Sequence, residues 1–82
     1  MTVEKVSKDS CIIKTYRWHA KELFDEITDV LDIIRRQGHI VTRTMEDTKA
    51  PEGKVEYLVN GMSITKVKNL LEKIIKAAMV GA

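Results

Sequence analysis

Cysteine and proline are scarce in this sequence, which has one of each, and glycine occurs four times. With Cys11 alone, an internal disulfide and a zinc site of the paired Cys-x-x-Cys type are excluded. Small secreted domains usually carry a disulfide framework. A signal peptide is not expected either, because charges interrupt the amino-terminal segment: Glu4, Lys5, Lys8 and Asp9. We therefore expect a cytoplasmic protein.

Long apolar runs are also missing, so we expect no membrane-spanning helix and no membrane partner. The 82 residues suit a single domain covering residues 1–82. A content of 44% hydrophobic and 32% charged residues is typical of a folded chain rather than a disordered one. The net stability of such a domain is about 4–12 kcal/mol, at ~0.05–0.15 kcal/mol per residue. A partner subunit would therefore help to stabilise it.

Residues that carry chemistry are few and scattered. The sequence contains no G-x-S-x-G, H-E-x-x-H, P-loop or G-x-G-x-x-G motif. His19 and Glu22 lie three positions apart but supply only two metal ligands, whereas zinc usually takes at least three from protein. Cys11 opens an apolar segment, which predicts a buried thiol rather than a nucleophile. We predict no enzyme, and no catalytic residue, cofactor or metal site. An enzyme would require His19 or His39 to converge with Cys11 or a carboxylate.

An amphipathic helix is expected from about His19 to Gln37, with Gly38 following its last turn. Acidic residues lie outside the apolar stripe and come early, whereas Arg35 and Arg36 come last, as the helix dipole favours. The apolar residues recur at three- and four-residue steps and form one stripe: Ala20, Leu23, Phe24, Ile27, Val30, Leu31 and Ile34.

A second helix is expected from about Ile64 to Met79. Ser63 is its predicted N-cap, and Met62 before it is placed to pack on Val67 as a hydrophobic staple. The apolar face consists of residues at helical spacing: Ile64, Val67, Leu70, Leu71, Ile74 and Ala78, with Ile75 at its edge.

Between the helices, two strands joined by a hairpin loop are expected at Ile40–Glu46 and Lys54–Asn60. Apolar residues alternate regularly in the second strand, as in a half-buried strand. In the first strand, strict alternation places Val41, Arg43 and Met45 on one face. A further strand is expected at Cys11–Tyr16, which is rich in β-forming residues.

These elements predict an α+β fold in which two amphipathic helices cover one face of a small antiparallel sheet. The sheet has three strands, or four if Thr2–Val6 is also a strand, and the order is (β)-β-α-β-β-α. Residues 1–9 form either a flexible tail or this extra edge strand. No part of the sequence resembles a known family closely enough to transfer functional residues.

The second helix carries a candidate contact surface for an anion or a partner, made of Lys66, Asn69, Lys73 and Lys76 within about 80° of one another on a helical wheel. Residues 63–79 contain four lysines and one glutamate, whereas residues 19–37 contain three basic and five acidic residues. The lysines form either an ordinary solvated face or a surface for nucleic-acid phosphate or an acidic protein. In a third interpretation, the basic helix meets the acidic helix of another copy.

Arg17, Trp18 and Ile33 are the candidates for a protein interface. Arginine and tryptophan are enriched at interfaces and also stack on bases. A tryptophan at the edge of the core is the plainer interpretation of Trp18. Ile33 lies about 120° from the centre of the first helix's apolar stripe, which favours exposure.

From these features we predict a small non-enzymatic interaction or regulatory module that acts through protein–protein contacts. It is expected to associate with itself as a homodimer or to bind another protein. The alternative is a nucleic-acid-binding regulator that contacts phosphates with the basic second helix.

Overall fold

The computed structural model describes the backbone of residues 1–80 and the side chains of residues 1–78. It confirms the α+β fold with a four-stranded antiparallel sheet and two helices. The elements follow in the order β1 (Thr2–Ser7), β2 (Ser10–Tyr16), the short 3-10 helix η1 (Ala20–Glu22), α1 (Phe24–Arg36), β3 (Ile40–Asp47), β4 (Lys54–Asn60) and α2 (Ile64–Val80). None of the helices in this described part is long and apolar enough to cross a membrane.

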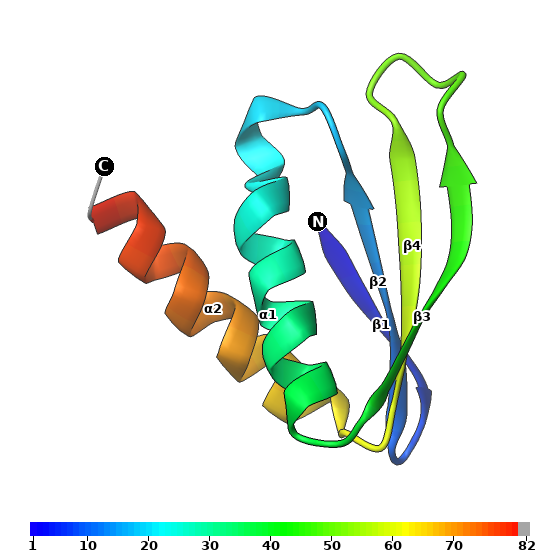
Figure 1. The fold of residues 1–82 in the computed structure, drawn as a ribbon, viewed down its shortest axis with the longest axis vertical. Coiled ribbons are helices and arrows are strands. Elements are labelled where there is room, and N and C mark those ends of the chain that lie inside the picture. Colours follow the sequence, from blue (N-terminus) through cyan, green and yellow to red (C-terminus); the bar gives the residue numbers. More distant parts are fainter. Residues whose placement is uncertain (81–82) are drawn as a thin grey trace.

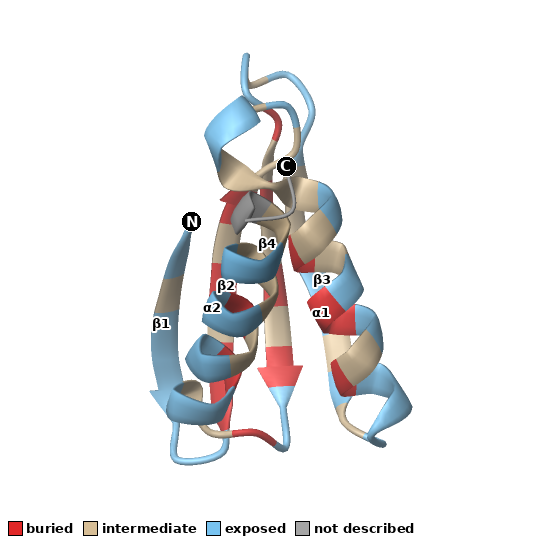
Figure 2. Cartoon of the chain, turned by 90° about the vertical axis from the view of Figure 1, so that its left-hand side faces the viewer, coloured by how far each residue is buried: buried red, intermediate tan, exposed pale blue. Residues whose placement is uncertain are grey.

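The sheet has the strand order β1-β2-β4-β3, so β1 and β3 are its edges. All three pairings are antiparallel. Both helices lie on the same face of the sheet, with α2 on the β1 side and α1 on the β3 side (Figures 1 and 2). The molecule therefore has two layers, and the opposite face of the sheet carries no helix.

The core lies between the sheet and the helices. Every second residue of β2 and β4 points into it, including Ile13 and Val59, which are fully buried. The apolar stripe of α1 contributes Ile27, Val30, Leu31 and Ile34, and α2 contributes Val67 and Leu71. Thr15 is a buried polar residue in this core, and its hydroxyl donates to Oε2 of Glu22 at 3.0 Å.

The first helix begins later than the sequence predicts. Residues 20–22 form the separate turn η1, and Leu23 then has φ 52°, in the left-handed region. This change of direction breaks the helix, so Ala20 is exposed and α1 starts at Phe24. The expected carboxyl end is correct, because Gly38 has φ 91° and follows the last turn.

The strand β3 departs from strict alternation. Its register with β4 shifts between Arg43 and Met45: Arg43 pairs with Tyr57 on the inner face, whereas Met45 pairs with Glu56 on the outer face. The prediction that Met45 shares a face with Val41 is therefore wrong. The physical reason is a β-bulge, which inserts one residue and reverses the facing of those that follow.

Candidate functional site

The lysines predicted on α2 form a continuous ridge on the outside of the helical layer. Lys66, Asn69, Lys73 and Lys76 are all exposed. Among the described residues, no carboxylate lies within 4.0 Å of these lysine ammonium groups. The ridge is therefore a positive surface whose lysines form no ion pair within the described residues, and we call it the α2 ridge.

The neighbouring helix α1 presents the opposite charge. Asp25, Asp29 and Asp32 are exposed and lie on one side of α1, and only Asp32 has an ion pair in the described part of the chain, with Arg35 at 3.2 Å. We call these three aspartates the α1 ridge. The helices α1 and α2 pack side by side on the same face of the sheet (Figure 2). The helical layer therefore carries a negative ridge on one helix and a positive ridge on its neighbour.

Arg17 is held by neighbouring side chains at the end of β2. Its Nη2 lies 2.5 Å from Oε1 of Glu46, and its guanidinium carbon lies 5.3 Å from the centre of the Phe24 ring. Arg43 binds the other oxygen of Glu46 at 2.9 Å. Within the described residues, the Nε of Arg17 is buried without a hydrogen-bond partner. The guanidinium of Arg17 is therefore held mainly by the contacts with Glu46 and Phe24.

Trp18 is the largest exposed apolar side chain, with 58% of its surface accessible. Its backbone N–H donates to the carbonyl of Glu52 at 3.1 Å, which fixes it at the β3–β4 loop. Ile33 is half-buried and follows Phe24 by nine residues, about 14 Å along the axis of α1. The structure brings Arg17 and Trp18 to the same end of the sheet but does not bring Ile33 to them.

The histidines and the cysteine lie in separate places. His19 Nδ1 accepts the N–H of Lys21 at 3.3 Å, and His19 Nε2 lies 3.8 Å from Glu52 Oε1. His39 lies against Gly61 at the other end of the sheet. Cys11 is fully buried, and burial raises the pKa of its thiol, which disfavours the nucleophilic thiolate. In the described part of the chain, no three side chains of metal-ligating type lie together.

The uncovered face of the sheet is a surface that the sequence interpretation did not identify. Ile12 pairs directly with Leu58 at its centre, and both are half-buried. Beside them, Nζ of Lys14 lies 3.1 Å from a carboxylate oxygen of Glu4 and 3.9 Å from one of Glu56, so the ionic groups there largely compensate one another. The hydrogen bond to Glu4 is the main cause that raises the pKa of Lys14. The sequence does contain a signal for this surface: Ile12 and Leu58 are apolar although they occupy the side of their strands that faces away from the core, where polar residues are expected.

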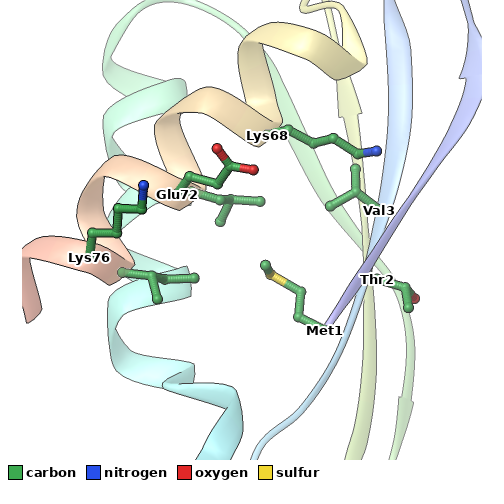
Figure 3. A pocket seen from close by; sticks show the side chains of 8 residues that line it. Met1, Thr2, Val3, Lys68, Glu72 and Lys76 are labelled. Atoms are coloured by element: carbon green, nitrogen blue, oxygen red, sulfur yellow. The ribbon is translucent and has the colours of Figure 1, made fainter. Parts of the chain in front are cut away.

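A second unpredicted feature is a groove between β1 and α2 with a volume of about 590 Å³. Its apolar lining comes from Met1 and Val3 on one side and from Leu71 and Ile75 on the other. Lys68, Glu72 and Lys76 also line it, along one flank of α2 (Figure 3). No sequence signal identified it, because the groove depends on how α2 crosses β1.

Comparison of the chain with protein-family models, with curated proteins and with solved structures found no match. The functional argument therefore depends on the surfaces themselves: the α2 ridge, the α1 ridge, the uncovered sheet face and the groove.

Proposed function

We propose that this chain is a non-enzymatic interaction module that acts through protein–protein contacts and associates with itself. The observation that supports this proposal is the pair of ridges of opposite charge on the helical layer, in which only Asp32 has an ion pair among the described residues. Two copies related by a two-fold axis would place the α2 ridge of each copy on the α1 ridge of the other. In such an isologous contact every favourable ion pair occurs twice.

The strength of this contact follows from its exposure. An exposed ion pair contributes about 0.2–1 kcal/mol, so charge alone gives weak and reversible association. Complementary ridges mainly raise the association rate and exclude partners of the wrong charge. Weak association that responds to conditions suits a regulatory module.

Sedimentation equilibrium over a concentration series tests the proposal. We expect the average mass to rise from monomer toward dimer with concentration, and the dissociation constant to increase with salt, because screening shortens the range of the attraction. A wild-type protein that stays monomeric throughout the series would reject self-association.

Reversing the charge of each ridge tests whether the two ridges form the contact between copies. Lys66→Glu with Lys73→Glu, and separately Asp25→Lys with Asp29→Lys, should each weaken the dimer because like charges then face each other. Mixing the two variants, or combining all four changes in one chain, should restore association. Lys8→Glu with Lys49→Glu is the matched control, because it makes the same charge change at two residues that lie in the β1–β2 and β3–β4 loops and belong to neither ridge. Association that is unaffected by either helical pair would exclude these ridges as the contact.

A nucleic-acid-binding regulator is the second candidate, and the observation that favours it is the absence of carboxylate partners near the α2 ridge in the described chain. Binding to phosphates would weaken with salt, with log K falling linearly against log salt. Replacing Lys66, Lys73 and Lys76 with Gln should then flatten that slope by about one unit per lost phosphate contact. Fluorescence anisotropy with labelled duplex and single-stranded oligonucleotides measures this, and no binding at low salt would reject it.

A further inference from the structure

The groove between β1 and α2 lies beside a free edge of the sheet. The strand β1 pairs only with β2 among the described strands, so the backbone groups along its outer edge have no strand partner. Its pairing is regular from Thr2 to Lys5, and the register shifts only between Lys5 and Ser7. An unpaired regular edge of this kind accepts an extended chain as an added strand.

The inner side of such an added strand would face the groove. Val3 pairs with the buried Ile13, so Val3 points to the helical side of the sheet and lines the groove together with Leu71 and Ile75. Figure 1 shows α2 leaving the sheet toward its carboxyl end, and the groove lies between this helix and β1. An apolar side chain projecting inward from an added strand would therefore reach a preformed apolar surface.

The charges on the α2 side of the groove determine which charges a bound segment should carry. Lys68, Glu72 and Lys76 succeed one another at four-residue steps, and the two lysines are about 12 Å apart along the helix axis. Residues i and i+4 of a strand lie on one face about 13 Å apart. Neither lysine has a carboxylate within 4.0 Å among the described residues. Glu72 lies between the two lysines and would repel an acidic residue at the middle position of a bound segment.

We propose that the β1 edge and this groove bind an extended segment of another protein with the pattern acidic–x–apolar–x–acidic. The segment adds to β1 as a fifth strand. Its central apolar side chain fills the groove against Val3, Leu71 and Ile75. Its two carboxylates pair with Lys68 and Lys76.

A second copy of this chain does not fit the pattern. With a valine placed in the groove, the other edge strand, β3, presents Val41 followed by Arg43 on its inner face, with Glu46 only beyond the bulge, and β1 presents Val3 followed by Lys5. Either strand would bring a cation toward Lys68 or Lys76, where an acidic residue is needed. The groove is therefore a site for a different protein.

A labelled peptide with the core Glu-Thr-Val-Thr-Glu tests this site by fluorescence anisotropy. We expect saturable binding to the wild-type protein. The core Lys-Thr-Val-Thr-Lys should bind at least about tenfold more weakly, which corresponds to about 1.4 kcal/mol. Methyl NMR shifts on peptide addition should centre on Val3, Leu71 and Ile75.

Matched variants on one helix separate the groove from general electrostatics. Lys68→Glu with Lys76→Glu should reduce peptide affinity at least about tenfold, whereas Lys66→Glu with Lys73→Glu, outside the groove, should change it less than about threefold. Circular dichroism checks that each variant remains folded. Equal effects of the two pairs, or no saturable binding of the acidic peptide, would overturn the proposal. Binding of dodecanoate in the groove without peptide binding would also overturn it, by identifying an alkyl carboxylate as the occupant.

Discussion

At the scale of single residues, Trp18 packs so closely on Gly53 that this position leaves no room for a side chain. Gly53 has φ 66°, and a Cβ at this position would lie 2.8 Å from Cε3 of Trp18. The carbonyl of Gly53 also accepts the N–H of Arg17 at 2.8 Å. A glycine is thus required both by the left-handed backbone and by the indole ring that covers it.

Gly53→Ala should destabilise the fold by about 1–3 kcal/mol, because it adds left-handed strain of about 1–2 kcal/mol to the steric overlap with Trp18. Urea denaturation followed by circular dichroism measures the change. In a double-mutant cycle, Trp18→Ala should recover part of the loss, since it removes the overlapping ring. Strict additivity of the two substitutions would show that the contact with Trp18 does not contribute.

At the scale of elements, the start of α2 follows local rules more closely than the start of α1. Ser63 Oγ accepts the N–H of Lys66 at 3.4 Å, a long N-cap hydrogen bond, and Met62 and Val67 are both buried as a hydrophobic staple requires. In contrast, the N-cap residue of α1 is Leu23, which makes no side-chain cap hydrogen bond and has a left-handed conformation. Tertiary contacts surround that start: Arg17 lies over the Phe24 ring, and Thr15 donates a hydrogen bond to Glu22.

Ser63→Ala should destabilise the protein by about 1 kcal/mol, the usual effect of removing an N-cap. Ser63→Asp should be at least as stable as wild type, because α2 has no acidic residue in its first turn and a carboxylate there interacts favourably with the helix dipole. Thermal and urea unfolding of the three proteins test both statements. A Ser63→Asp variant as unstable as Ser63→Ala would show that capping does not limit α2.

At the scale of the whole molecule, two buried groups tie stability to alkaline pH. Burial raises the pKa of the Cys11 thiol above 9.0. Burial is also the main cause that raises the pKa of Tyr57 above 10.0. Each group is neutral when protonated, so above these values the unfolded chain loses protons more readily than the folded one. Their contribution to stability is therefore complete below about pH 9 and is lost as pH rises through the folded-state pKa values.

The contribution of these two groups to the free energy of unfolding should accordingly stay constant up to about pH 9 and fall above it. In Cys11→Ala the onset of the fall should move toward pH 10, the ordinary value for tyrosine. Urea titrations from pH 7.5 to 10.5 give the free energy of unfolding at each pH. Its slope against pH is compared between the two proteins, rather than its absolute value, because the substitution itself lowers stability. A wild-type free energy that does not decrease up to pH 10.5 would contradict the raised pKa values.

The sequence by itself determined the fold class, the bounds of Lys54–Asn60, the apolar stripe of α2 and that of α1 from Phe24 onward, because these depend on periodicity and local capping. The break at Leu23 and the bulge after Arg43 depend on tertiary packing, so strict periodicity misplaced the start of α1 and the facing of Met45. The lysines of the α2 ridge were found from helical spacing alone. The groove was not, because residues 68 positions apart, such as Val3 and Leu71, come together only when α2 crosses the edge strand.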